Sequence, residues 1–311
     1  MRENHFERLL EYLRAGVEEV TIFGAVSFAY EGEIIHELGG ENLIFGRSLM
    51  KPFQYRVFAK DSGHKFTSEQ VAIAVSSHSA EPQHLKIVHQ LLGEELEPYL
   101  KTPSVFRYGA ANLPGETISR LNHPCSGKHS AILRGCSDRG WDLESYLSND
   151  HPYQQAYREE VRSVFGKNWS APVTATDGCG LPTKAMTVNQ LALAYSYIAQ
   201  TRNENGVWDA MTKHPELIGG TNRLDTAIMK ASSGRIIAKE GADGIIGLAV
   251  VSEKFPIGLG VTIKISHGSD DQAIYFIAQK ILHQFGVDVR PLPFVTKSAA
   301  TILDRVVPDL T

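Results

Sequence analysis

Residues 46–53, GRSLMKPF, place Ser48 and Lys51 three positions apart, with Pro52 directly after the lysine. On a helix, residues i and i+3 lie on the same side, so the serine hydroxyl and the lysine amine can come within hydrogen-bonding reach. A hydroxyl beside a base is the minimum arrangement for an activated nucleophile. A proline is tolerated in the first helical turn, where several N–H donors lack helical partners anyway. The segment therefore predicts a helix start that could carry a base-activated serine.

A lysine acts as a base only if its pKa is lowered. A free lysine has a pKa of about 10.4, so only about one amine in 10³ is neutral at pH 7. Burial lowers this pKa, and so does a second positive charge nearby. Lys239, in AKEGADG at the end of an apolar segment, is the predicted second cation. A single serine–lysine spacing also occurs by chance in many chains, so by itself it leaves an accidental surface pair open.

The composition excludes several classes of protein. The chain has 311 residues, 42% hydrophobic and 21% charged, which is enough to bury a large core and argues against disorder. A net charge of -4 without a basic run gives no indication of nucleic acid or an anionic membrane as partner, so we expect a small molecule. Three cysteines are too few for a disulfide framework, and neither an export signal nor an apolar run of roughly 20 residues is visible. We expect a reduced, cytoplasmic protein.

The hydrophobic pattern predicts the elements that position these residues. Apolar residues between Phe6 and Leu13 recur at helical spacing and predict an opening amphipathic helix, and the two β-rich runs EEVTIFGAVSFAY and EIIHEL around EG predict a hairpin. Residues 67–234 are predicted to be mostly helical, with capping boxes beginning at Thr67 and Thr187. Three strands and a helix follow from about residue 235.

These elements predict an α/β (α+β) fold, in which one antiparallel sheet is built from both chain termini and flanked by helices. Residues 1–60 and 235–311 would form the sheet and its flanking helices. Residues 61–234 would form a mostly helical subdomain inserted between them. We expect the active site between the two parts.

Three short motifs in order carry a first resemblance. SxxK at 48–51, SHS at 77–79 and KEG at 239–241 resemble the SxxK, SxN and KTG motifs of the serine β-lactamase, penicillin-binding-protein and glutaminase-like superfamily. The resemblance implies a serine β-lactamase-like fold. Because SHS and KEG depart from the usual motifs, a β-lactam substrate is not expected.

Six segments together carry a closer resemblance, to the rhizobial-type L-asparaginases of the asparaginase II family. They are SLMKPFQ, AVSSHSAEPQH, LNHPCSGKHSAIL, TDGCGLPT, GGTNRLDTAIM and AKEGADG, and they extend over roughly residues 20 to 270. The resemblance implies two serine–lysine pairs, Ser48 with Lys51 and Ser77 with Lys239. It also implies a zinc site and a homodimer. The implied metal ligands are Cys125, Lys128 and Cys179.

The residues by themselves leave the metal site open. Zinc favours thiolates and imidazoles, but two cysteines on separate loops could equally be buried thiols. With the resemblance we expect a zinc that modulates the pocket and does not activate a hydrolytic water, and no organic cofactor. Cys136, on a predicted helix, is interpreted as a core residue.

Three further residues are candidates for binding the substrate. Asp177 could hold an α-ammonium, Arg47 an α-carboxylate, and His129 lies next to an implied metal ligand. Asp177 could also be only a turn residue and Arg47 only a solvated one. The roles of His78 and His123 stay open.

The resulting hypothesis is an L-asparagine amidohydrolase that releases L-aspartate and ammonia through a serine acyl-enzyme. A glutaminase or another serine amidohydrolase of the superfamily remains an alternative, because one methylene changes discrimination by only about 1 to 3 kcal/mol. A peptidase or β-lactamase is disfavoured by the missing export signal. An alternative of another class is a non-catalytic amino-acid or zinc-binding sensor on the same scaffold.

Overall fold

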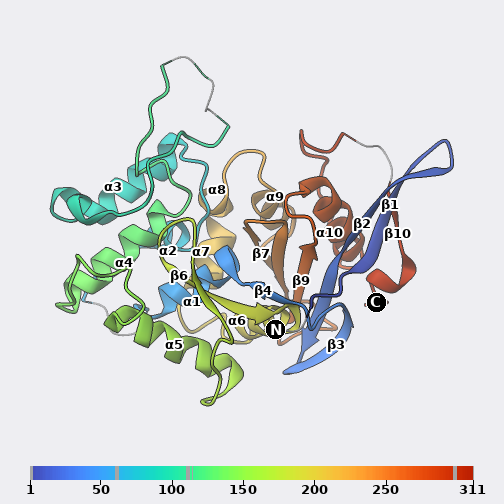
Figure 1. The fold of residues 1–311 in the computed structure, drawn as a ribbon, viewed down its shortest axis with the longest axis horizontal. Coiled ribbons are helices and arrows are strands. Elements are labelled where there is room, and N and C mark those ends of the chain that lie inside the picture. Colours follow the sequence, from blue (N-terminus) through green and yellow to red (C-terminus); the bar gives the residue numbers. More distant parts are fainter. Residues whose placement is uncertain (1–2, 60–62, 110–112, 114, 297–299, 311) are drawn as a thin grey trace. The chain divides into compact units, whose positions relative to one another are not determined.

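A computed structural model describes residues 3–59, 63–109, 113, 115–296 and 300–310 (Figure 1). Contacts between Cα atoms divide the chain into two compact units. The first, here called the sheet unit, comprises Met1–Leu49, Ala185–Thr201 and Asn222–Thr311. The second, here called the helical unit, comprises Met50–Lys184 and Arg202–Thr221. No helix in these described ranges is both long and apolar enough to cross a membrane.

The main sheet of the sheet unit is antiparallel and is built from the two ends of the chain. The main path of strands runs β10-β1-β2-β9-β8-β7, and β3 pairs with β2 off this path. Because β2 pairs directly with β9, the expectation of a sheet assembled from both termini is confirmed. The fold is α/β with a mostly antiparallel sheet flanked by helices, whereas the likeness to serine β-lactamases stays a prediction. The strands are β1 (Glu7–Arg14), β2 (Val17–Tyr30), β3 (Glu33–Leu38), β7 (Ile236–Gly241), β8 (Ile245–Val250), β9 (Leu259–Ile265) and β10 (Thr301–Ile302).

The predicted opening helix is wrong, because this segment is strand β1. It pairs with β2 on one side and with β10 on the other. A register shift between Arg8 and Leu10 interrupts the alternation of the strand, and both Leu9 and Leu10 are buried. A β-bulge of this kind adds a residue to one strand, so neighbouring apolar residues need not follow a period of two. The sequence spacing therefore imitated a helix.

The predicted hairpin of β2 and β3 is confirmed. Tyr30 pairs with Glu33, and the two residues between them, Glu31 and Gly32, have φ angles of 53° and 82°. Two successive residues with positive φ are typical of a tight hairpin turn whose twist matches that of the strands. The EG dipeptide thus sets the register of β3 on β2.

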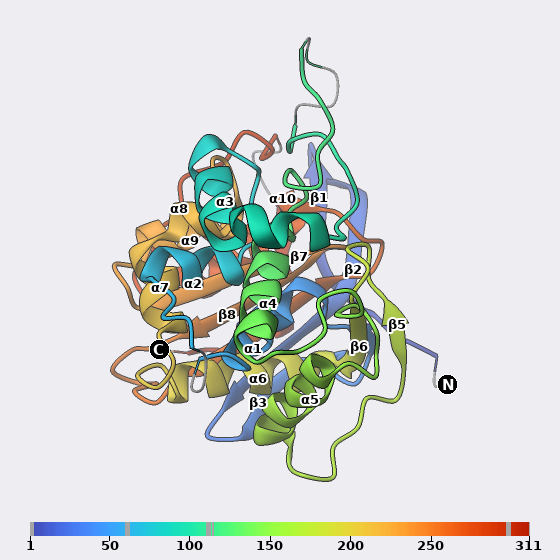
Figure 2. The same ribbon diagram turned by 90° about the vertical axis from the view of Figure 1, so that its left-hand side faces the viewer.

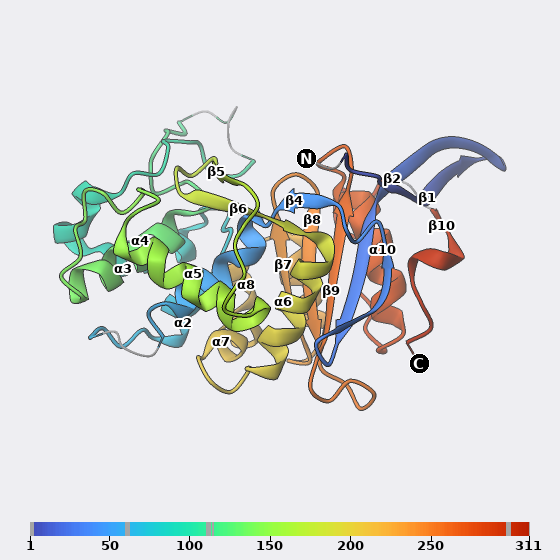
Figure 3. The same cartoon turned by 60° about the horizontal axis from the view of Figure 1, so that its bottom comes forward.

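Helices cover both faces of the sheet. Helix α6 (Val188–Gln200) packs on β2, β8 and β9, and α10 (Asp271–His283) lies on the opposite face (Figure 3). Gly260 allows the close approach of α6, because a Cβ there would lie 2.0 Å from the carbonyl oxygen of Ala192. Helix α9 (Leu224–Ala231) packs against the edge strand β7. Strand β4 (Leu43–Phe45) pairs with residues 185–187 in the same unit.

The helical unit contains several short helices and one ribbon. Helices α2, α3 and α4 pack against one another (Figure 2). The predicted capping boxes are present at Thr67 in this unit and at Thr187 in the sheet unit. Strand β5 and the first residues of β6 form an antiparallel ribbon where the sequence predicted only a loop. The elements are α1 (Lys51–Arg56), α2 (Ser68–Ala74), α3 (Pro82–Leu96), α4 (Ser126–Asp138), α5 (Pro152–Phe165), β5 (Thr174–Thr176), β6 (Pro182–Thr187), α7 (Val207–Lys213) and α8 (Pro215–Ile218).

The observed division of the chain has different limits from the sequence-based one. The expected boundary between residues 60 and 61 lies outside the described residues. The expected boundary between residues 234 and 235 would assign α6 and α9 to the helical middle, but both belong to the sheet unit. Each packs its buried face on a strand, which is why sequence position alone did not assign it.

Candidate active site

Ser48 lies in a tight helical turn directly after β4. The turn covers Arg47–Met50, and α1 continues it from Lys51 with Pro52 in its first turn. Arg47 has a φ angle of 46°, a left-handed conformation that costs a non-glycine residue about 1 kcal/mol or more. Such strain persists where the surrounding structure imposes it, often beside functional groups. The serine–lysine spacing of three residues thus falls on one helical segment.

Lys51 is a buried lysine with polar partners on the helical unit. It is 0% exposed, and its Nζ donates to the hydroxyl of Ser77 over 2.9 Å. It also donates to the carbonyl oxygens of Ser76 and, over 3.4 Å, Pro124. Ser77 itself is held in place, because its backbone N–H donates to the carbonyl oxygen of Ile218 over 2.8 Å. The structure therefore joins one member of each predicted serine–lysine pair, Lys51 and Ser77.

Lys239, on β7 in the sheet unit, has an acidic partner that sequence reasoning missed. Lys239 and Asp225 are each 0% exposed, and Lys239 Nζ lies 3.3 Å from Asp225 Oδ2. Burial lowers the pKa of Lys239, and the carboxylate of Asp225 opposes this effect. The pKa of Asp225 is lowered, since the positive charges of Lys239 and Arg223 outweigh the effect of burial. The predicted partner Ser77 belongs to the other unit, so that pairing stays a prediction.

Gly241, the last residue of the KEG motif, lies beside the backbone of the candidate nucleophile. A Cβ on Gly241 would lie 3.7 Å from Ser48 N and 3.0 Å from Leu49 Cδ1. Such a Cβ would also lie 2.6 Å from Ile245 Cγ2, so a side chain at this position would clash with Ile245 and crowd Leu49, the residue after Ser48, while touching Ser48 N at an ordinary contact distance.

The predicted metal ligands lie close together in the helical unit. Lys128 Nζ is 3.3 Å from Cys179 Sγ, and Cys125 and Cys179 are near enough for each thiol to influence the pKa of the other. Interaction with Cys179 lowers the pKa of Cys125, and interaction with Cys125 raises the pKa of Cys179. Burial would lower the pKa of Lys128, but the negative charge of both cysteines and of Asp177 outweighs burial and raises it. The two sulfurs are ligands of a kind that zinc favours.

The three predicted ligands include only two residues of the usual metal-binding types. Within the described ranges, no group of three or more His, Cys, Asp and Glu side chains is placed to hold a metal ion. A lysine amine must lose its proton before it can coordinate. The zinc site therefore stays a prediction. Cys136, by contrast, is a free thiol buried in the core, as expected.

Two of the candidate substrate-binding residues, Asp177 and His129, flank the cysteines. Asp177 forms the tight turn of the β5–β6 ribbon, with its backbone N–H donating to Leu181 O over 2.8 Å. His129, on α4, is fully buried, and its Nδ1 lies 2.8 Å from the hydroxyl of Tyr146. That hydroxyl accepts the backbone N–H of Lys101 over 3.0 Å and retains both its own proton and a second lone pair for the bond to Nδ1. Nε2 of His129 is a buried atom with no hydrogen-bond partner among the described residues.

The other two histidines beside the motifs make local hydrogen bonds. Nε2 of His78 bonds the Ser126 hydroxyl over 2.9 Å, and its Nδ1 accepts the backbone N–H of Ala80. Nδ1 of His123 accepts the backbone N–H of Cys125 over 3.0 Å. Burial lowers the pKa of His78 well below its usual value, so this ring is neutral at pH 7.

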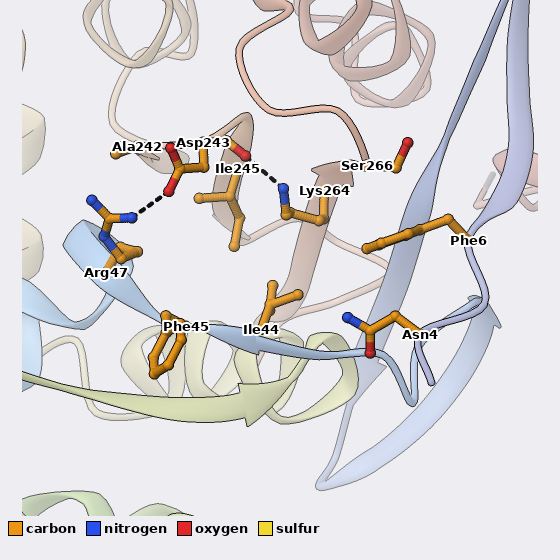
Figure 4. Close-up of a pocket in the computed structure, with 10 residues that line it drawn as sticks. All are labelled: Asn4, Phe6, Ile44, Phe45, Arg47, Ala242, Asp243, Ile245, Lys264 and Ser266. Carbon is orange, nitrogen blue, oxygen red and sulfur yellow. Dashed lines mark hydrogen bonds and ion pairs between the residues drawn. The ribbon is translucent and has the colours of Figure 1, made fainter. Parts of the chain in front are cut away.

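Arg47 lines a cavity of about 260 Å³ in the sheet unit (Figure 4). Its guanidinium forms an ion pair with Asp243, whose side chain is 66% exposed. A second cation that sequence reasoning missed, Lys264, lines the same cavity and donates to the carbonyl oxygens of Asp243 and Ile265 over 2.6 Å each. The sequence around Lys264 predicted a strand by its apolar pattern, and this pattern gave no sign that the lysine would line a cavity. Two cations and one acid leave this cavity with a net positive charge.

Comparisons with known proteins identify the family. A comparison with curated proteins gave no match. The family model for L-asparaginase II matches residues 10–304 of the 311. The match includes every motif described above, from the serine turn to the KEG strand. The chain therefore belongs to the L-asparaginase II family and is an L-asparaginase, a hydrolase.

Proposed function

We propose that this enzyme hydrolyses L-asparagine through a serine acyl-enzyme, with Ser48 as nucleophile and Lys51 as its base. One observation carries the proposal: the residue three positions after Ser48 is a fully buried lysine whose amine contacts a second serine, Ser77. Surface lysines do not adopt such a position, because burying a charged amine is costly. Burial of an amine acts toward the neutral form that a base requires, whereas the carbonyl oxygens of Ser76 and Pro124 act toward the charged form, and we propose that Lys51 reacts as the neutral amine.

The contacts of Lys51 suggest the route of the proton. Ser48 Oγ attacks the side-chain amide carbon of asparagine, and Lys51 Nζ accepts the hydroxyl proton. Because Nζ also contacts Ser77 Oγ, the proton can pass through Ser77 to the nitrogen that leaves as ammonia. The aspartyl group is then an ester of Ser48. Water attacks this ester, the same groups carry its proton, and L-aspartate is released.

The backbone at Ser48 supplies a candidate oxyanion donor. Gly241 places no side chain beside Ser48 N, and we propose that the oxygen of the substrate approaches the N–H from this side. One donor aimed at the developing oxyanion is typically worth about 3 to 4 kcal/mol. In this proposal, the glycine at the end of the KEG motif keeps a side chain away from the oxyanion position.

The polar groups around the thiols suit the amino-acid part of the substrate. Burial and then the charge of Lys128 lower the pKa of His129 well below its usual value, so the ring is neutral, and we propose the tautomer with the proton on Nε2, which would be the donor to the substrate. Asp177 supplies the negative charge that an α-ammonium group needs. We propose Arg47 for the α-carboxylate, where it would exchange the exposed Asp243 for the substrate.

Zinc, if bound, would be held by Cys125, Lys128 and Cys179. It would supply a fixed positive charge that orients polar substrate groups near the ribbon turn. Chelation with EDTA followed by zinc addition tests this. We expect KM to rise on chelation and to recover with zinc, and Cys125→Ser should lower zinc content without abolishing turnover. Unchanged KM and rate after complete zinc removal would contradict the role.

The mechanism is tested with Ser48→Ala and Lys51→Met. Both variants should lose turnover of asparagine by several orders of magnitude in an ammonia-release assay, while folding is retained by circular dichroism. Ser79→Ala is the matched control, since Ser79 lies in the same motif as Ser77 and its hydroxyl donates to a backbone oxygen, Gly219 O, over 2.9 Å. Its turnover should stay within a few-fold of the parent.

Mass spectrometry of the enzyme quenched during turnover identifies the nucleophile. We expect an adduct with the mass of asparagine minus ammonia on the peptide that contains Ser48. An adduct on any other residue would overturn the assignment of the nucleophile. No ammonia release from asparagine at all would favour a non-catalytic sensor.

A further inference from the structure

A second cavity lies in the helical unit, between α5 and the β5–β6 ribbon. Its volume is about 160 Å³. No Asp or Glu is among the described residues that line it, although three of those residues are cationic. The lining residues are Asn149, Arg158, Arg162, Trp169, Ser170, Ala171, Thr174 and Lys184.

Lys184 is the most buried cation of this cavity. It is 4% exposed, on strand β6, and its Nζ lies 5.3 Å from the ring centroid of Tyr157. Among the residues that the structure describes, no hydrogen bond or ion pair engages the Lys184 amine. A cation–π contact contributes only about 0.5 to 2 kcal/mol, which does not replace the lost hydration of an ammonium group.

The two arginines come from α5 and are held by the chain around the cavity. Arg158 donates to the carbonyl oxygen of Asn149 over 3.2 Å. Arg162 donates through Nε to the carbonyl oxygen of Trp169 over 3.2 Å, and its Nη1 bonds Glu159 over 2.7 Å on the outer side of the helix. Each guanidinium has five N–H donors, so each retains donors for a ligand.

Three like charges around one cavity repel one another. Burial, and then the positive charge of Arg158, lower the pKa of Lys184 to about 8, so the amine is still mostly charged at pH 7. An anion in the cavity would relieve the repulsion and satisfy the unengaged donors. At roughly 30 Å³ for each water molecule, the cavity has room for about five waters, so an anion with the size of a phosphate fits.

We propose that this cavity binds a phosphate group, either inorganic phosphate or the phosphate of a phosphomonoester. A phosphate has five heavy atoms and acceptor oxygens in several directions, which match donors that converge from α5 and from β6. Guanidinium groups bind phosphate oxygens in a fork, and the hydroxyls of Ser170 and Thr174 add donors at the edge. The proposal is independent of the catalytic mechanism, because none of these residues takes part in it.

The site borders the ribbon that carries two candidate active-site residues. Thr174 on β5 pairs with Lys184 on β6, and the ribbon then turns at Asp177 and Cys179. A ligand between α5 and this strand pair would therefore contact the end of the ribbon opposite the turn that contains Asp177 and Cys179.

Isothermal titration calorimetry of the full-length enzyme with inorganic phosphate tests the proposal, at constant ionic strength with chloride as the balancing anion. Lys184→Met keeps the aliphatic stem against Tyr157 and removes the charge, and Arg158→Gln is a second variant in case the first is poorly folded. The control is Lys86→Met, an exposed lysine on α3 of the same unit. Emission of Trp169, isolated by comparison with Trp169→Phe, reports binding at the cavity itself.

We expect saturable phosphate binding with a change in Trp169 emission, about tenfold or more weaker in both cavity variants and unchanged in Lys86→Met. Tighter binding of glycerol phosphate than of inorganic phosphate would assign the site to a phosphomonoester, and the reverse order would assign it to free phosphate. Absence of binding by both, or equal binding in the parent and the cavity variants, would overturn the proposal.

Discussion

Replacing Lys239 with methionine should destabilise the protein strongly, because it removes only one member of a buried ion pair. Lys239 Nζ and Asp225 Oδ2 are 3.3 Å apart and neither residue is exposed. At an effective dielectric constant of about 20, two unit charges at this distance attract each other by about 5 kcal/mol. In the intact pair, the cost of removing both charges from water offsets much of this attraction. In Lys239→Met, Asp225 would keep its own desolvation cost but lose the larger of its two compensating charges, since only Arg223 would remain of the two.

We therefore expect Lys239→Met to lower the free energy of unfolding by about 3 to 5 kcal/mol. Asp225 would retain the backbone N–H donors of Thr226 and Glu240, at 2.8 and 3.2 Å, which limits the loss. Asp225→Asn should be destabilising for the reciprocal reason, since it leaves the amine of Lys239 buried without its carboxylate.

The double variant Lys239→Met, Asp225→Asn separates the pair from its parts. If the two charges interact as described, the loss of unfolding free energy in the double variant should be smaller than the sum of the losses in the two single variants, by at least about 2 kcal/mol. Urea unfolding at pH 7, followed by tryptophan emission and by circular dichroism, gives the four free energies. Lys230→Met, an exposed lysine on α9, is the control and should change stability by less than about 0.5 kcal/mol.

If the two single losses of unfolding free energy add up to the loss in the double variant, the reasoning is refuted, because the two side chains then do not interact. Activity gives a separate readout. If Lys239 also has the predicted catalytic role, turnover should stay low in the double variant even though stability returns. Recovery of turnover together with stability would restrict Lys239 to a structural role.

Three smaller changes test other parts of the description. Thr67→Ala should lower the free energy of unfolding by about 1 kcal/mol through loss of the cap of α2, whereas Thr67→Ser should retain it, as measured by urea unfolding. Gly241→Ala should lower kcat more than it raises KM, because its Cβ would lie 3.0 Å from Leu49 Cδ1, in the turn that carries Ser48, and 2.6 Å from Ile245 Cγ2 on the neighbouring strand; an unchanged kcat would contradict that placement. Burial, and then the charge of Asp225, raise the pKa of Glu240 from 4.5 to about 8, so the folded chain holds a proton there that the unfolded chain releases. Stability should accordingly fall as pH rises from 4.5 to about 8, and Glu240→Gln should remove this part of the pH dependence.

Elements that depend on neighbouring residues were predictable from the sequence. The capping boxes at Thr67 and Thr187 are formed by side chains three residues apart, and the β2–β3 hairpin depends on two turn residues with positive φ. The three strands from Ile236 onward and helix α10 were also found from apolar patterning and turn residues. In each case the conformation is determined by residues that are close together in the sequence.

Elements that depend on distant partners were not predictable in this way. Strand β1 has a helix-like spacing, and only its pairing with β2 and β10 makes it a strand. The β5–β6 ribbon contains a Gly-rich turn that was interpreted as a loop, because its pairing is short. Helices α6 and α9 were assigned to the helical middle of the chain, whereas they belong to the sheet unit, because they pack on its strands.

The sequence by itself determined which side chains can do the chemistry, namely a serine and a lysine three positions apart on a helix start, two cysteines in loops, and a lysine that ends a strand. Their types and local spacing follow from covalent neighbours. Only the tertiary structure decided what each of them meets: Lys51 contacts Ser77, Lys128 contacts Cys179, and Lys239 is paired with Asp225. These partners lie from 14 to 51 residues apart along the chain. Contacts at such separations depend on how helices and strands pack, and the pKa values that catalysis requires arise from that packing.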